Sequence, residues 1–373
     1  MSLMPQSSIA HKPTADLSNL VEGVSIIALF GATGAGKSSF ANLASGRDDL
    51  TVGHSTRSCT QNVYQTVPFK VDGRPVVLID CPGFDDSHSS DAEILKRIAA
   101  FLTFTYEKNI NLTGIIYLHR ITDNRFGGAS GSNFRMFRKM CGTDACQNVL
   151  IVFGMWSYPP TEEQIAREAD LINGEHAFKG ILAEGAKTAR HLEKTRDSAF
   201  SIIRRLIGHK PVPLELPRQI HGGMKLEETA AGRAVAGELG EQLRQQKKTI
   251  EQLKQDQKDA IADNDKKWQN EISQQEKRAE ASSKALQNQI DSLKNNGQAD
   301  LTKLFMDAQQ KHLAEMLDMQ LKFQERADKA EQRRDTERAD HRAAMEKMQA
   351  EHAQGMKDLV MDMANQRSGC IIC

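Results

Sequence analysis

The feature that most constrains this chain is a glycine loop set between an apolar run and a run of helix formers. Residues 24–30 read VSIIALF, GATGAGKS follows at once, and SFANLAS then has helical character up to Gly46. Strand, glycine loop and helix form the context that a G-x-x-x-x-G-K-[ST] match requires. Backbone N–H groups in such a loop converge on an anion at the positive end of the helix. The stretch therefore predicts a phosphate-binding loop.

Each residue type in this loop has an expected role. The glycines let the backbone wrap around phosphates without interference from a Cβ atom. Lys37 is expected to reach the β and γ phosphates and to serve catalysis, and the Ser38 hydroxyl is expected to bind Mg²⁺. The predicted nucleotide-binding residues of the loop are Gly31, Ala32, Thr33, Gly34, Ala35, Gly36, Lys37, Ser38 and Ser39.

A second apolar run, within RPVVLIDCPGFDD, ends in an acid. Asp80 stands at the carboxyl end of this expected strand, where open α/β sheets bind their ligands. It is the predicted Mg²⁺ partner, through water. Pro82 and Gly83 follow as a turn, and the Gly83 N–H is predicted to point at a γ-phosphate.

Between these two motifs lies a polar segment, TVGHSTRSCTQNV, with several hydroxyl side chains. A switch loop needs a Thr or Ser to complete the Mg²⁺ shell when γ-phosphate is present. Thr60 is the first choice for this metal-binding and catalytic role, and Thr56 is the second. The alternative is a solvated loop whose threonines have no such role.

Apolar strands alternate with helical patterns through the first part of the chain, and this alternation predicts an α/β fold, a mostly parallel sheet with helices on both faces. No proline follows Pro217, and helix formers then dominate. The expected strands are 24–30, 76–80, 114–118 and 148–153, and the expected helices are 37–45, 91–107, 131–140, 162–178 and 194–208. The predicted domains are 1–22, a flexible segment; 23–220, the phosphate-binding domain; 221–366, a long helical and coiled-coil region; and 367–373, a flexible tail.

Charge and cysteine content exclude several classes of function. Lys plus Arg and Asp plus Glu number 49 each, so no basic excess indicates nucleic acid as a partner. The 6 cysteines are too scattered for a disulfide framework. No apolar run approaches the roughly 20 residues that span a bilayer, and no secretory signal is evident. A cytoplasmic location is expected.

The motifs GATGAGKSS and DCPGFDD, with the hydroxyl-rich loop between them, resemble those of the septin, Toc and immunity-associated (GIMAP-type) GTPases. Residues 114–142 and a strand ending in Met-Trp are most similar to G-domain proteins of mushroom-forming fungi (basidiomycetes). The resemblance covers roughly residues 23–235. It implies a P-loop G domain that binds GTP with Mg²⁺, and pairing of two chains through their nucleotide faces.

The chain departs from that pattern at two places. The strand NVLIVF is followed by Gly154-Met155-Trp156-Ser157, with no Asn/Thr-Lys-x-Asp motif to select guanine, so GTP and ATP both stay open. Trp156 is predicted to stack on the base, with a core position as the alternative. Phe84 follows Gly83 and cannot orient water, so turnover is expected to be slow.

Two arginines, Arg120 and Arg125, are candidates for stabilising charge across a dimer, with ordinary surface arginines as the alternative. His119 follows an apolar strand and is expected to be a core or edge residue rather than a base.

The rear third carries apolar residues in a 4-then-3 rhythm. Leu239, Leu243, Ile250 and Leu253 begin it, the spacing recurs at residues 286–293, and its phase slips near Gly297. Self-association of these helices is favoured. The alternatives are helices folded back on the first domain and a solvated single helix.

The last four residues, Cys370 to Cys373, read CIIC, which is the prenylation pattern of a cysteine, two aliphatic residues and a final residue. Cys370 is therefore the predicted lipidation site, and the alternative is an accidental exposed end. The combined prediction is a slow, oligomerising nucleotide switch that a lipid holds peripherally on the cytoplasmic face of a membrane. The alternative is a non-hydrolysing, nucleotide-bound coiled-coil scaffold.

Overall fold

The structure, a computed structural model, describes residues 23–47, 50, 63–84, 89–123, 126–127, 129–262 and 266–368. The chain divides into two compact units, Met1–Gln309 and Gln310–Cys373. Two helices that follow residue 220 contact helices of the sheet domain within the first unit, and the predicted domain bounds stay predictions.

A mostly parallel sheet forms the centre of the first unit, as predicted. Its strand order is β2-β4-β1-β5-β6-β7, and β3 pairs with β4 off this path. The strands β4, β1, β5, β6 and β7 are parallel, whereas β2 and β3 run antiparallel to β4. The bounds are β1 (Ser25–Phe30), β2 (Tyr64–Gln65), β3 (Phe69–Val71), β4 (Arg74–Asp80), β5 (Gly114–Arg120), β6 (Val149–Gly154) and β7 (Lys187–Arg190).

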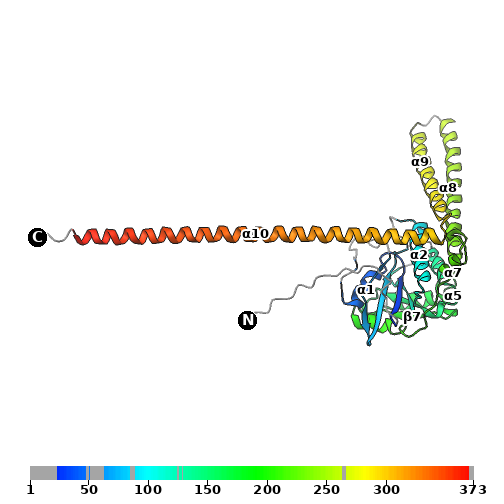
Figure 1. Ribbon diagram of the computed structural model, residues 1–373. Coiled ribbons are helices and arrows are strands. Elements are labelled where there is room, and N and C mark those ends of the chain that lie inside the picture. The colour runs from blue at the N-terminus through cyan, green and yellow to red at the C-terminus, as the bar shows by residue number, and fades with distance from the viewer. Residues whose placement is uncertain are drawn as a thin grey trace. The chain divides into compact units, whose positions relative to one another are not determined.

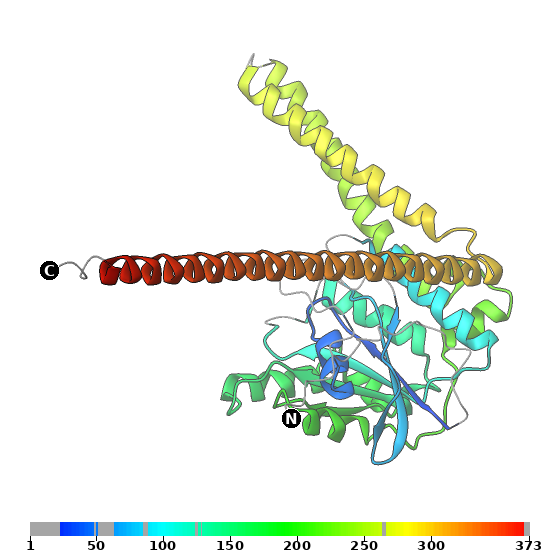
Figure 2. The ribbon, with the colours of Figure 1, turned by 60° about the vertical axis from the view of Figure 1, so that its left-hand side comes forward.

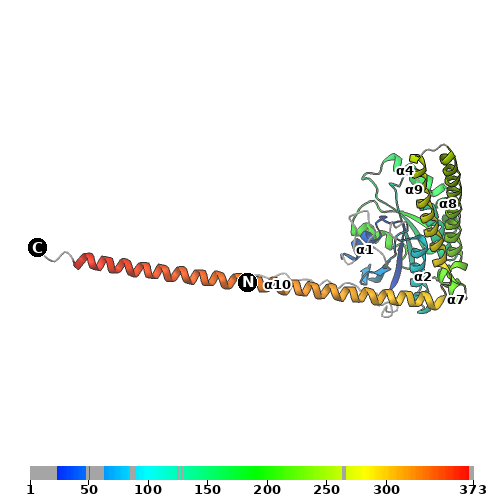
Figure 3. The same ribbon diagram turned by 90° about the horizontal axis from the view of Figure 1, so that it is seen from above.

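The middle residues of the central strands are apolar and buried, as expected where helices cover both faces of a sheet. Successive residues of β1 alternate between two core clusters: Leu29 belongs to one, and Phe30 to the other. The first cluster includes residues of α1 (Lys37–Ser45) and α6 (Arg196–Ile203), and the second includes residues of α2 (Asp91–Glu107) and α3 (Ala129–Cys141). Figure 3 shows α1 and α2 on opposite sides of the sheet.

The helix predicted over 162–178 ends earlier, as α4 (Glu162–Asn173), and a separate short helix, α5 (Lys179–Ala183), follows it. Thr161 begins α4 with a reciprocal capping box to Gln164. At Gly174 the backbone turns away, and a Cβ atom added there would lie 2.9 Å from the Asp170 carbonyl oxygen. A glycine at this position therefore lets the chain leave the helix closely packed against its last turn.

Two helices of the rear third, α8 (Ala230–Ala262) and α9 (Lys266–Leu293), pack side by side as an antiparallel hairpin (Figure 1, Figure 2). Leu253 and Ala260 of α8 are buried with Ile272 and Ala279 of α9. The start of α8 packs on α3, and Leu239 joins the core beneath the sheet. Leu239 and Leu253, two of the regularly spaced apolar residues predicted for this region, are thus buried against other parts of the same chain. Self-association of these helices stays a prediction.

The helix α10 (Gln298–Ser368) begins directly after Gly297, where the phase of the apolar pattern was predicted to slip. Within the first unit, Leu301 is fully buried, and the Phe305 ring lies 4.8 Å from that of Phe104 on α2. Gln298 and Thr302 both donate hydrogen bonds to Glu107 at the end of α2. The first turns of α10 are therefore part of the sheet domain.

The second unit continues α10 with exposed apolar side chains at Leu313, Leu317 and Leu321. Asp318 and Lys322 of this helix form an ion pair at 2.7 Å. Across the described ranges, no helix combines the length and apolar character needed to cross a membrane.

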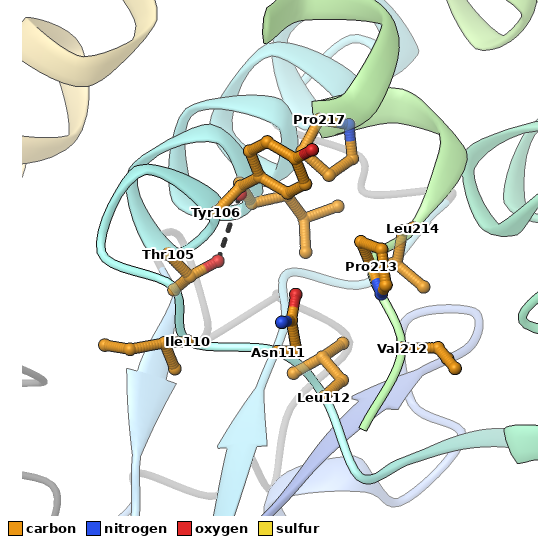
Figure 4. A pocket seen from close by; sticks show the side chains of 10 residues that line it. Thr105, Tyr106, Ile110, Asn111, Leu112, Val212, Pro213, Leu214 and Pro217 are labelled. Carbon is orange, nitrogen blue, oxygen red and sulfur yellow. Dashed lines mark hydrogen bonds between the residues drawn. The ribbon is translucent and has the colours of Figure 1, made fainter. Parts of the chain in front are cut away.

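Short connections cover the amino ends of the parallel strands, at the end of the sheet opposite the glycine loop. There α7 (Glu215–His221) packs near the end of α2, and the Val212 N–H donates to the Leu112 carbonyl oxygen at 3.1 Å. Tyr106, Asn111 and Pro213 are among the residues that line a small hollow at this end of the sheet (Figure 4). It lies before the first residue of β5, so it is not part of the predicted phosphate site.

Candidate nucleotide-binding site

The glycine loop joins β1 to α1 in the conformation that its glycines permit. Gly34 and Gly36 have φ values of 75° and 94°, in the left-handed region that favours glycine. Gly31 has φ 138°, and a Cβ atom added there would lie only 2.2 Å from the Leu118 carbonyl oxygen of β5. The loop thus fits against the neighbouring strand only because residue 31 has no side chain.

Lysine, serine and aspartate meet at this loop, as predicted from three separate motif positions. The Lys37 ammonium donates hydrogen bonds to the carbonyl oxygens of Gly31 and Ala32, both at 3.0 Å. The Ser38 hydroxyl donates a hydrogen bond at 2.6 Å to Oδ2 of Asp80, the last residue of β4. Lys37 and Asp80 are both buried, at 6% and 1% exposure. A cation and a pair of oxygen ligands are therefore held at the mouth of the phosphate loop.

The predicted Mg²⁺ fits these side chains. Hydroxyl and carboxylate oxygens are the ligands that hard divalent cations prefer, and Mg²⁺ binds through one or two such groups together with phosphates and water. Within the described part of the chain, no group of three or more His, Cys, Asp and Glu side chains is arranged to hold a metal ion. The pair formed by Ser38 and Asp80 is accordingly the candidate ion site.

The segment after Asp80 runs alongside the glycine loop. The Thr33 N–H donates to the Phe84 carbonyl oxygen at 2.7 Å, and the Phe84 N–H donates to the Gly31 carbonyl oxygen at 3.3 Å. A Cβ atom added to Gly83 would lie 2.5 Å from Thr33 Oγ1. Glycine at position 83 therefore permits this close approach, and the contact between its N–H and a γ-phosphate stays a prediction.

Phe84 has a structural role that its position in the sequence did not reveal. Its ring is fully buried and stacks on Phe30 with the centroids 6.3 Å apart. An aromatic side chain here anchors the segment to the core below the loop. Phe84 accordingly offers no polar group to a water molecule in the site.

Trp156 lies in the core rather than on an open surface. Its exposed fraction is 9%, and its indole N–H donates to the Phe153 carbonyl oxygen at 2.8 Å. The Arg190 guanidinium lies over the ring at 4.9 Å from its centroid and also pairs with Glu168. This burial favours the core alternative for Trp156, and its contact with a base stays a prediction.

His119 is a core residue, as expected. Its ring packs against those of Phe126 and Phe178, with centroids 5.5 and 5.4 Å away, and only 5% of the residue is exposed. Burial lowers the pKa of His119 to about 4, although the charge of Asp123 acts in the opposite direction. The imidazole is thus neutral at pH 7.

This burial predicts a pH-dependent stability. The folded pKa of about 4 lies below the ordinary value of 6.5, so the unfolded chain binds the proton more tightly. The contribution of the neutral His119 ring to the free energy of unfolding is fully present above pH 6.5. It decreases by about 1.4 kcal/mol per pH unit as the pH is lowered from 6.5 toward 4. Denaturant unfolding of wild type and His119→Phe between pH 7 and 4.5 checks this. The variant should show the shallower pH dependence, and equal slopes would contradict the prediction.

Arg120 is a candidate for stabilising charge across a dimer, with an ordinary surface arginine as the alternative, and both stay predictions. In the structure its guanidinium flanks the loop of its own chain: a Cβ atom added to Gly34 would lie 3.4 Å from Arg120 Nη1. The parallel pairing of β1 with β5, which aligns Phe30 with Tyr117, brings the two segments together.

Several predicted site residues fall outside the described ranges. They are Thr60 and its alternative Thr56, the second arginine Arg125, and the lipidation site Cys370. Their roles stay predictions.

One family model matches the front of the chain. Residues 26–123 match the family model described as 50S ribosome-binding GTPase. These residues contain both motifs of the site, and this part of the chain is therefore similar to that GTPase family. The predicted closeness to fungal proteins gains no support. A search of curated protein sequences finds no match.

Solved structures that match part of this chain include Toc33 from Arabidopsis thaliana in complex with GDP and Mg²⁺. It is 15% identical, with a TM-score of 0.40 over 52% of this chain and 88% of that one. Aquifex aeolicus Era bound to GDP·AlF4⁻ is 12% identical, with a TM-score of 0.34 over 51% of this chain and 58% of that one.

Proposed function

We propose that this chain binds GTP with Mg²⁺ at the glycine loop, hydrolyses it slowly, and uses the nucleotide state to control its self-association at a membrane. The observation that carries the proposal is the convergence of Lys37 with the hydrogen-bonded pair Ser38 and Asp80. The family match over residues 26–123 supports GTP in preference to ATP.

Different groups of the protein bind the phosphates and the Mg²⁺. Lys37 places a positive charge beside the loop, and the loop N–H groups at the start of α1 point at the phosphates. Ser38 and Asp80 would hold the Mg²⁺, which, when bound, neutralises charge on the outer phosphates. Phe84 leaves the attacking water without a polar partner at that position, and slow turnover follows.

Self-association rests on different features. The exposed leucines Leu313, Leu317 and Leu321 of α10 give the second unit an apolar surface that a second copy could cover. Pairing through the nucleotide faces is the other proposed contact. Dimerization is described as important for the GTPase activity of the chloroplast translocon components atToc33 and psToc159.

A hydrolysis assay with labelled GTP or ATP and purified full-length protein distinguishes the nucleotide switch from the non-hydrolysing scaffold. We expect GTP to be turned over, the turnover per molecule to rise with protein concentration, and ATP to be bound more weakly. Bound GTP that persists unchanged for hours would instead support the non-hydrolysing scaffold. Failure of both nucleotides to bind in the presence of Mg²⁺ would remove the proposal.

The membrane part of the proposal has its own test. One prenyl chain gives marginal, reversible binding, and several chains in one assembly bind more firmly. We expect the protein made in eukaryotic cells to sediment with membranes, and Cys370→Ser to release it to the cytosol. Cys373→Ser is the matched control, since serine at the last position keeps the prenylation pattern. Equal sedimentation of wild type and Cys370→Ser would contradict lipid attachment.

A further inference from the structure

The end of β5 brings an arginine to the phosphate loop. Leu118 of β5 lies against Gly31 so closely that a Cβ atom on Gly31 would be 2.2 Å from its carbonyl oxygen. Two residues later the strand ends at Arg120. Its Nη1 lies beside Gly34, in the middle of the loop, where an added Cβ atom would be 3.4 Å away. This guanidinium and the Lys37 ammonium thus flank one loop.

The backbone that carries Arg120 is held on several sides. Arg120 pairs with Gly154 of β6, and the Ile121 N–H donates to the Gly154 carbonyl oxygen at 2.9 Å. Ile121 is fully buried, and its own carbonyl oxygen accepts a hydrogen bond from Arg167 of α4 at 2.8 Å. The arginine therefore projects from a fixed turn.

An acid in the same turn orients the side chain. Asp123 Oδ1 lies 2.9 Å from Arg120 Nε, and the two side chains are 19% and 34% exposed. The Asp123 N–H also donates to the Arg120 carbonyl oxygen at 3.2 Å, which closes the turn. Asp123 thus lies beside Nε of the guanidinium, while Nη1 lies beside Gly34 of the loop.

From this placement we propose that Arg120 binds the phosphate oxygens of the nucleotide held by its own chain and acts as a catalytic residue in hydrolysis. Asp123 is its positioning residue. The inference rests on the proposed function, because it requires a nucleotide in the loop. It gives Arg120, which the sequence offered only as a candidate for action across a dimer, a role within its own chain.

The chemistry explains why an arginine is useful here. In hydrolysis the water oxygen bonds to the γ-phosphorus while the bond from that phosphorus to the β–γ bridging oxygen breaks. The bond's electron pair goes to the diphosphate, and the water's proton passes to the released phosphate or to solvent. A guanidinium beside the loop stabilises the charge that collects on these oxygens, with N–H groups spaced for two of them. Since Phe84 cannot orient water, we expect this charge stabilisation, added to that of Lys37, to contribute strongly to the step.

Single-turnover hydrolysis by full-length variants tests the role. We expect Arg120→Ala to slow the step about 100-fold, the effect typical of removing one transition-state donor. Arg120→Lys should recover little, since an ammonium lacks the planar fork, and Asp123→Asn should give a smaller loss. Arg204→Ala is the matched control, because Arg204 pairs with Asp72 away from the loop. An Arg120→Ala rate equal to that of wild type overturns the proposal.

A mixing experiment decides whether the arginine acts within its own chain. Lys37→Ala keeps Arg120 but should not hold nucleotide, so it can donate an arginine only to another chain. We expect that adding it in excess to Arg120→Ala leaves the slow rate unchanged. Restoration of the rate would overturn action within the chain and assign Arg120 to a partner copy.

Binding measurements keep this inference distinct from the proposed function. We expect Arg120→Ala to bind a non-hydrolysable triphosphate analogue about tenfold more weakly, with unchanged affinity for GDP, since a charged hydrogen bond to the γ-phosphate is lost. Unchanged affinities for both ligands, in a protein with no measurable turnover, would overturn the role of Arg120 while leaving nucleotide binding intact. A wild-type protein that binds neither ligand would overturn the proposed function itself.

Discussion

Replacement of Lys37 with methionine is expected to weaken triphosphate binding about 1,000-fold. Methionine keeps the length and apolar stem of lysine, so the change removes the charge rather than the bulk. The lost group is a buried ammonium, 6% exposed, that donates to two loop carbonyls. Removing one partner of a buried charged contact costs about 2–5 kcal/mol, and the phosphates would then face those carbonyl oxygens without the intervening cation.

Titration calorimetry with GTP and Mg²⁺ measures this effect. Lys70→Met is the matched control, because Lys70 is an exposed lysine on β3 and its loss should leave the affinity unchanged. The circular dichroism and unfolding midpoint of Lys37→Met should stay near those of wild type. A folded variant that still binds GTP with wild-type affinity would show that the nucleotide, if any, is held elsewhere.

Much of this site could be predicted because its parts are local in sequence. A glycine loop before a helix, and an acid after an apolar strand, each follow from a few adjacent residues, and a parallel sheet must bring the carboxyl ends of its strands to one edge. The hydrogen bond between Ser38 and Asp80 is the outcome. The position of Arg120 depends instead on the pairing of β5 with β1, which no short motif records.

The parts of the fold that were missed share a physical cause. β2, β3 and β7 have 2, 3 and 4 residues, too few for a period-two pattern to emerge. The rear helices were recognised, but an apolar stripe does not say which surface covers it. Leu239 is buried in the core of the sheet domain and Leu253 in the hairpin, although both belong to one rhythm along α8.

Two glycines of α8 are expected to respond to the same substitution with opposite signs. Gly232 lies in the first turn, and a Cβ atom added there would be 1.9 Å from the Leu226 carbonyl oxygen. That oxygen also accepts the Thr229 hydroxyl at 2.7 Å, and Thr229 in turn accepts the Gly232 N–H at 3.0 Å. Gly237, five positions further along, is exposed and would have nothing within 4 Å of its Cβ atom.

Gly232→Ala should therefore destabilise the protein by about 3–5 kcal/mol, because backbone rather than a flexible side chain must move. Gly237→Ala should stabilise it by about 0.5–1 kcal/mol through helix propensity alone. Chemical denaturation gives both values, and hydrogen exchange of residues 226–240 shows whether the loss begins where α8 meets the sheet domain. Since Leu226 and Thr229 are fully buried, opening this turn exposes core residues, and exchange there should rise in Gly232→Ala alone. If both substitutions changed the free energy of unfolding by the same amount and with the same sign, the close approach at Gly232 would not be what holds the hairpin in place.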